Sequence, residues 1–205
     1  MGIINTVMLT KPLARVRAAL LLLSLLAAVS IAHAQKASSE DDTPPTLPTD
    51  PDTHLVAYTG VVDVPGTTQA QLYSRAYEWV VKTYNSPKDV IQMQDKESGK
   101  IIVKASSKAR ITKYDSGFNL YTFSIYVKEG KYKYDVTDLR NEHVVLSGQY
   151  AGDYSLGRFE QAEPNIKTKQ SQRGWNNLRR NAEADIKALL SSLQAAMAAK
   201  DKSDF

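Results

Sequence analysis

The chain has 205 residues, of which 42% are hydrophobic, and a formal net charge of +4. This length and composition can bury one ordinary hydrophobic core but hardly two, so we expect a single domain. Of the 26 lysines and arginines, Lys11, Arg15 and Arg17 lie in the first 34 residues; the other 23 face 22 acidic residues, leaving a net charge of +1. A nearly neutral domain gives no argument for a nucleic-acid partner.

The first 34 residues have the pattern of an export signal. The three basic residues precede an apolar run over 18–31, which ends in Ala32-His33-Ala34, a small-x-small cleavage pattern. We expect cleavage after Ala34 and export to the periplasm or the extracellular medium. A retained membrane anchor is the alternative, because the apolar run with its flanks approaches the roughly 18 residues that a spanning helix needs.

The segment that follows, residues 35–54, is rich in proline and aspartate and has almost no apolar residues. Such a segment cannot bury enough surface to offset the entropy of ordering it, so we expect a disordered linker. One domain is then expected over 55–200, with a disordered tail over 201–205. The chain has no cysteine, so the domain has no disulfide to stabilise it.

A strand followed by a helix opens the domain. Residues 56–64 are rich in β-branched residues and end at Pro65-Gly66. Thr67 or Thr68 can cap the helix that follows, and a breaker cluster at 85–87 ends it. The apolar positions of this helix recur at steps of three and four: Leu72, Ala76, Trp79 or Val80, and Tyr84.

Four further segments alternate apolar and polar residues, as half-buried strands do: 90–94, 100–105, 120–127 and 131–136, followed by a short apolar strand at 143–146. Short turns between them require antiparallel pairing. If the apolar positions face the helices, the opposite face of the sheet is polar. It then displays Lys100, Lys104, Thr122, Ser124, Tyr126, Lys131 and Lys133.

The end of the chain is predicted to form a loop and a long helix. Residues 147–170 lack a clear period and predict a long loop. Apolar residues then recur over 173–199, which predicts a helix roughly 40 Å long whose last turns project beyond an ordinary small sheet. The predicted fold is therefore α+β, β-α-β-β-β-β-(β)-α, an antiparallel sheet of five to six strands with two helices packed on one face.

The run from Val61 to Lys104 resembles the N-terminal signature of a family of exported bacterial domains of unknown function with a TATA-box-binding-protein-like (TBP-like) fold; later strands match more loosely. The matching pieces are Val64-Pro65-Gly66, Leu72-Tyr73-Ser74-Arg75-Ala76, Glu78-Trp79, Val90-Ile91-Gln92, and Asp95-Lys96 with Gly99-Lys100. The resemblance implies that the antiparallel sheet is curved. It implies no activity and gives no catalytic residues to transfer.

Few residues of the sequence suggest metal binding or catalysis. Two histidines outside the signal, His54 and His143, lack the spacing of a metal site, and we expect no metal or other cofactor. Asp135, Asp138 and Glu142 cluster around a predicted turn and are candidate acid–base carboxylates of a hydrolytic or ligand-modifying enzyme. Turn chemistry and exposure to solvent explain the same residues without any catalysis.

Binding is the favoured hypothesis. Tyr150, Tyr154 and Phe159 accompany Arg158 in the glycine-containing loop, and aromatic residues with arginine are typical of binding hot spots. The alternative is a loop that folds back over the sheet. Tyr126 is the aromatic candidate on the polar face, which otherwise lacks the interleaved aromatics of a nucleic-acid binder.

We therefore expect a non-catalytic domain at the cell envelope that binds a protein, glycan or small ligand through the open sheet face or the 147–170 loop. The terminal helix is a candidate surface for self-association.

Overall fold

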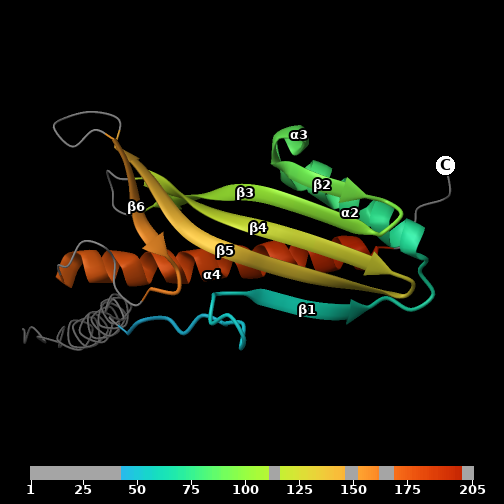
Figure 1. Ribbon diagram of the computed structural model, residues 1–205, viewed down its shortest axis with the longest axis horizontal. Helices are drawn as coiled ribbons and strands as arrows, with labels where there is room; N and C mark the ends of the chain where they lie inside the picture. The colour runs from blue at the N-terminus through green and yellow to red at the C-terminus, as the bar shows by residue number, and fades with distance from the viewer. Residues whose placement is uncertain (1–42, 111–115, 146–151, 162–168, 200–205) are drawn as a thin grey trace, which may run out of the picture. The chain divides into compact units, whose positions relative to one another are not determined.

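The computed structural model describes residues 43–110, 116–145, 152–161 and 169–199. The elements in chain order are β1 (Tyr58–Asp63), α2 (Gln69–Thr83), α3 (Pro87–Val90), β2 (Ile91–Asp95), β3 (Lys100–Arg110), β4 (Ser116–Lys128), β5 (Lys131–Val145), β6 (Gly152–Arg158) and α4 (Lys169–Ala198) (Figure 1). The six strands form one sheet in the order β1-β5-β4-β3-β2, and β6 also pairs with β5. The predicted α+β fold is confirmed, with the short helix α3 in addition.

The start of the helix α2 is defined by a local pair of side chains. The Thr68 side chain accepts a hydrogen bond from the Gln71 amide, and the Gln71 side chain accepts one from the Thr68 amide, which makes a capping box. Thr68 is therefore the cap. The apolar positions predicted for this helix are buried from Leu72 to Val80.

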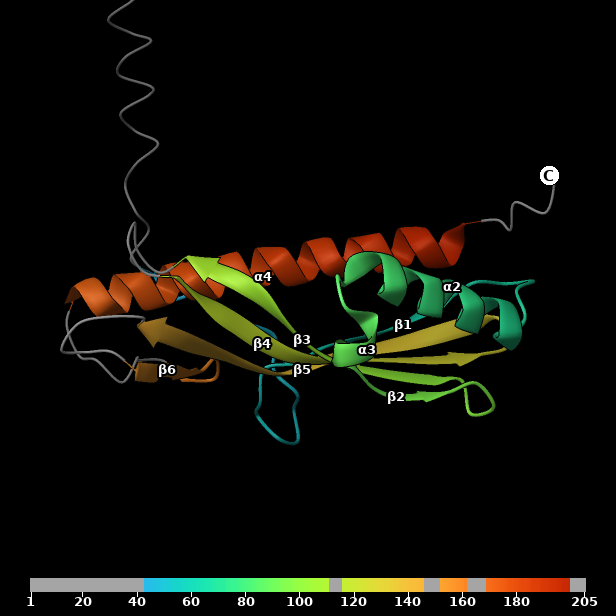
Figure 2. The same ribbon diagram turned by 90° about the horizontal axis from the view of Figure 1, so that it is seen from above.

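The helices α2 and α4 lie on the same side of the sheet, and no helix of the described residues lies on the other side (Figure 2). The core lies between these helices and the sheet, and it includes Trp79, Phe123, Ile125, Trp175 and Leu193. Alternate residues of β3, β4 and β5 point into this core, while the intervening residues form the opposite face. We call that opposite face the open face.

The last turns of α4 pack on α2 instead of projecting. Met197 is fully buried, and its carbonyl accepts a hydrogen bond from Arg75 of α2. The expectation of a projecting end assumed a small sheet, but β5 has 15 residues and is therefore about 50 Å long. A sheet of that length matches the 30-residue helix. None of the helices in the described part of the chain is long and apolar enough to span a membrane.

The strand β5 was predicted as two strands with a turn between them, and that prediction was wrong. Its first half pairs with β1 and its second half with β6, so β1 and β6 follow one another along the same edge of β5 (Figure 1). A register shift against β4 marks a β-bulge between the halves, where Asp138 has a φ of 57°. The extra residue breaks the alternation of side chains, which explains why the sequence resembles a turn.

Part of the segment expected to be a linker is ordered. Leu47, its one large apolar residue, is only 6% exposed. Thr49 forms a bridge with Val56, and the Thr43 carbonyl accepts a hydrogen bond from Arg180 of α4. Residues 43–54 therefore pack on the domain, because Leu47 gains a buried site that composition does not reveal.

Candidate functional site

The open face is arranged in rows that cross the strands. One row contains Val61, Lys133, Tyr126 and Lys100, contributed in turn by β1, β5, β4 and β3. The lysines and Tyr126 predicted for this face therefore share it, but the face also carries exposed apolar side chains, Val61 at 63% and Phe118 at 42%. Among its predicted members, Ser124 is only 8% exposed and contributes little to the surface.

A hollow of about 390 Å³ lies at one end of this face. Tyr126 lies within it, between two cations: the Lys100 ammonium is 5.4 Å and the Lys133 ammonium 5.8 Å from the centre of the tyrosine ring. This spacing allows cation–π attraction on an exposed surface. The residues that line the hollow, which we call the Tyr126 hollow, are Val61, Tyr126, Lys128, Lys131, Tyr132, Lys133 and Asp135.

The open face has an excess of hydrogen-bond donors. Its six lysines are Lys100, Lys104, Lys108, Lys128, Lys131 and Lys133. Within the described residues only Lys133 has an ion pair, with Asp135 at 3.0 Å, and Asp135 also accepts a hydrogen bond from Thr59. The carboxylates of Asp138 and Glu142 pair with arginines. The acids in the middle of this face are thus already occupied, whereas most of its lysines are not.

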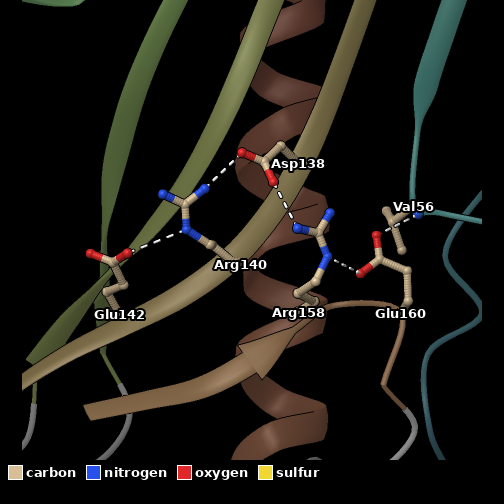
Figure 3. A network of polar contacts seen from close by, with 6 residues as sticks. All are labelled: Val56, Asp138, Arg140, Glu142, Arg158 and Glu160. Carbon is tan, nitrogen blue, oxygen red and sulfur yellow. Dashed lines mark hydrogen bonds and ion pairs between the residues drawn. The ribbon is translucent and has the colours of Figure 1, made fainter.

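A second concavity, of about 250 Å³, adjoins the bulge of β5, and its lining includes Lys104, Leu120, Asp138 and Arg140. Asp138 accepts hydrogen bonds from Arg140 at 2.7 Å and from Arg158 at 2.9 Å (Figure 3). Arg140 also donates to Glu142 at 3.2 Å. The two arginines therefore fix the carboxylate of Asp138, the residue with the left-handed backbone at the bulge.

The same chain of charges continues to the start of β1. Arg158 forms an ion pair with Glu160 at 3.3 Å, and Glu160 accepts a hydrogen bond from the Val56 amide at 2.7 Å (Figure 3). This contact bridges the space between the end of β6 and the beginning of β1. The arrangement is a structural clamp on the sheet edge, which we call the Glu160 clamp.

A buried arginine lies close to this clamp. Arg179 of α4 is 7% exposed, and its Nε has no hydrogen-bond partner among the described residues. Burial lowers the pKa of Arg179, while the nearby Glu160 carboxylate acts in the opposite direction. Burial also raises the pKa of Tyr58, in β1, to about 12. The Glu160 carboxylate thus helps to compensate a buried cation.

The three carboxylates proposed for catalysis are not brought together as a free pair. Asp135 lines the Tyr126 hollow, Asp138 lines the concavity at the bulge, and Glu142 lines neither. Each has a cationic partner. Among the described residues no group of three or more acidic or histidine side chains is placed to hold a metal ion. Asp135, Asp138 and Glu142 are thus held in ion pairs and are not arranged as a free carboxylate pair.

The four binding candidates of the predicted 147–170 loop do not form one site in the structure. Tyr150 lies outside the described residues, and Tyr154 lies in β6 with a side chain that the structure does not describe. Arg158 belongs to the Glu160 clamp. Phe159 is fully buried and packs edge-to-face on Trp175, with ring centres 5.5 Å apart, so its ring belongs to the core. The segment predicted as a loop therefore contains both a strand and a core residue.

Sequence reasoning missed Arg140, Glu160 and Arg179. A signal for two of them was present, because charges of opposite sign alternate at every second residue in Asp138, Arg140 and Glu142, and again in Arg158 and Glu160. Residues two apart share one face of a strand. Arg179 lies four residues after Trp175 and three before Ala182, so helical spacing places it on the apolar face, although its charge favours exposure to solvent.

Comparisons with known proteins agree with this fold. Residues 58–142 match the sequence model of a family described as a domain of unknown function (DUF4468) with TBP-like fold. A search among curated proteins found no match.

Several solved structures are similar, and two of them illustrate the likeness. A TBP-like protein from Parabacteroides distasonis ATCC 8503 has a TM-score of 0.52 and 16% identity, over 71% of this chain and 97% of that chain. A DUF4468 family protein from Bacteroides ovatus ATCC 8483 has a TM-score of 0.54 and 16% identity, over 78% of this chain and 94% of that chain. Such identities establish the fold alone.

Proposed function

We propose that this chain, which matches the DUF4468 family over residues 58–142 and has a TBP-like fold, is an exported, non-catalytic domain that binds a ligand on the open face of its sheet. The observation that carries the proposal is the excess of unpaired lysines on a face that no described helix covers. A side chain without an internal partner is free to contact a ligand. Export is proposed from the pattern of the first 34 residues.

Because the main chain of the sheet is already hydrogen-bonded, side chains are the groups that would recognise a ligand on the open face. At the row of Lys133, Tyr126 and Lys100, the strands β5, β4 and β3 each have a paired neighbour on both sides; β3 pairs with β2 over residues 100–103. Their amides and carbonyls are therefore engaged in the sheet, and a ligand on the open face meets ammonium, hydroxyl and aromatic groups instead. Recognition through such groups suits a glycan, a small ligand or an acidic protein surface at the cell envelope.

The enzyme alternative has less support. A hydrolase of the kind considered needs a carboxylate that can exchange a proton at a reacting atom. The candidates Asp135, Asp138 and Glu142 are instead held by lysine or arginine. Their geometry is better suited to fixing the sheet than to proton transfer.

Chemical-shift mapping tests the proposed surface. The isotopically labelled protein is titrated with neutral and acidic oligosaccharides, an acidic peptide and inorganic phosphate, and amide shifts are assigned along the chain. We expect shifts in the open-face residues of β3, β4 and β5. Shifts confined to α2, to α4 or to residues 147–170, or no shift with any member of the panel, would contradict the proposal.

Cell fractionation tests the proposed compartment separately. We expect the protein outside the cytoplasm, and N-terminal sequencing should begin at Gln35. A full-length protein that stays in the cytoplasm would show that the export part of the proposal is wrong.

A further inference from the structure

We infer that the Tyr126 hollow binds an anionic carbohydrate, a sugar chain that carries carboxylate or sulfate groups. The inference rests on the proposed function, since it names the ligand class of the same face. It follows from three properties of the hollow: its charge, its apolar floor and its place at the end of a line of lysines.

The charge of the hollow requires a ligand rich in acceptors. Lys128, Lys131 and Lys133 line it, and Asp135 is the acidic residue among the lining side chains. Asp135 is already engaged by Lys133 and Thr59. Lys128 and Lys131 have no ion pair among the described residues, and ammonium groups only donate hydrogen bonds. A ligand that offered donors alone would find few partners here, because the acceptors among the exposed lining side chains are the Tyr126 hydroxyl and the engaged Asp135 carboxylate.

The floor of the hollow suits a ring that has an apolar face. The Val61 side chain is 63% exposed beside it, and the Tyr126 ring and the lysine methylene groups complete an apolar lining. A volume of about 390 Å³ falls within the range of ordinary ligand sites. A sugar ring combines C–H groups on its face with oxygen acceptors around its edge, so it can use both parts of this surface.

The cations surround the hollow instead of following one line of contact. Lys131 and Lys133 lie two residues apart on β5, about 7 Å along the strand. Lys100 lies across β4 from Lys133, about 10 Å away. An extended acidic peptide normally joins a sheet through main-chain hydrogen bonds. At this row the main chain of β5, β4 and β3 is paired on both sides and denies it that contact, whereas a substituted sugar ring places acceptors in several directions.

A line of lysines leads away from the hollow and favours a polymer over a single sugar. Lys100, Lys104 and Lys108 lie on the open face of β3, each about 13 Å from the next. Lys104 also lines the concavity at the β5 bulge. A charged chain seated at Tyr126 can therefore continue across the sheet and contact cations at intervals.

Calorimetric titration tests the ligand class. The probes are oligogalacturonate, a neutral dextran oligosaccharide, poly-glutamate and single-stranded DNA. We expect oligogalacturonate to bind and dextran not to bind. Because binding energy concentrates on central aromatic residues, Tyr126→Ala should weaken oligogalacturonate binding roughly tenfold. Lys131→Gln should weaken binding by roughly threefold to tenfold, with the loss reduced at high salt.

Matched variants on the helix side serve as controls. Tyr77→Ala and Lys82→Gln make the same chemical changes on exposed positions of α2. We expect the affinity of both controls to stay within about twofold of the wild type. Tyr126→Phe keeps the ring and should retain most of the affinity, which separates a ring contact from a hydroxyl contact. Thermal unfolding of each variant checks that its fold is intact.

The outcomes separate the inference from the proposed function. If poly-glutamate or DNA binds as tightly as oligogalacturonate, or if Tyr126→Ala has no more effect than Tyr77→Ala, the ligand class is wrong. The proposed function still stands in that case if the open-face amides shift with another probe. If none of the four probes binds, the inference is overturned, and the wider shift-mapping panel decides the proposed function.

Discussion

Replacing Phe159 with alanine tests whether this side chain supports the core. Its ring is fully buried and lies edge-to-face on Trp175, whose indole N–H donates to the Gln161 carbonyl at 3.0 Å. Truncation removes buried ring atoms and leaves a cavity, so we expect a loss of about 3–5 kcal/mol in the free energy of unfolding. The melting temperature should fall by on the order of 10 °C for a chain of this size.

Phe118 supplies the matched control. It lies on the open face of β4 and is 42% exposed. Phe118→Ala should therefore cost less than about 1 kcal/mol. Both variants are measured by urea denaturation, comparing the midpoint and the slope with those of the wild type. If Phe159→Ala costs no more than Phe118→Ala, the Phe159 ring does not lie in the core and the reasoning is refuted.

Three other predictions concern the turns, the buried phenols and the edge clamp. Gly99→Ala should cost more than about 2 kcal/mol, because a Cβ atom there would lie 2.4 Å from a main-chain oxygen of β4; Gly66→Ala, with a similar positive φ and open space, should cost about 1 kcal/mol. Equal costs in urea denaturation would contradict the clash. Tyr132→Phe should leave stability unchanged or slightly raised at pH 7, since the phenol oxygen is buried without a partner in the described residues. Burial raises the pKa of Tyr132 from 10.0 to about 12, so the wild type should lose stability as the pH rises between these values, where the unfolded chain releases its proton first. An equally large alkaline loss in Tyr132→Phe would refute that assignment. Glu160→Ala should speed hydrogen exchange of the Val56 amide roughly tenfold, whereas Glu160→Gln, which keeps an acceptor, should have less effect; unchanged exchange in Glu160→Ala would count against the clamp.

The parts of the fold that depend on neighbouring residues were predictable. Thr68 and Gln71 define the start of α2 within one helical turn, and the spacing of its apolar residues defines its buried face. The alternation in β4 likewise placed Tyr126 on the polar face. Each of these features follows from contacts that are close in the sequence.

The parts that depend on distant residues were not predictable. The carboxylate of Asp138 at the bulge contacts Arg140 of its own strand and Arg158 of the next. The burial of Leu47 and Phe159 depends on surfaces that exist only after the sheet and helices assemble. No local pattern records such contacts, so a bulge resembled a turn and a packed segment resembled a linker.

The candidate site combines both kinds of information. The lysines and Tyr126 could be assigned to one face from alternation alone. The hollow itself needs Val61, which reaches this end of the sheet because β1 pairs with β5. That pairing joins residues about 70 positions apart and determines which side chains share the concavity.

Lysine footprinting tests the central claim most directly. The protein is acetylated with and without oligogalacturonate, and modification at each lysine is measured by mass spectrometry. We predict protection of Lys100, Lys131 and Lys133, with no change at Lys82 of α2 or Lys187 of α4, which lie on the helix side. Protection of Lys82 and Lys187 with the open-face lysines still fully reactive would contradict the proposal that the open sheet face is the binding surface.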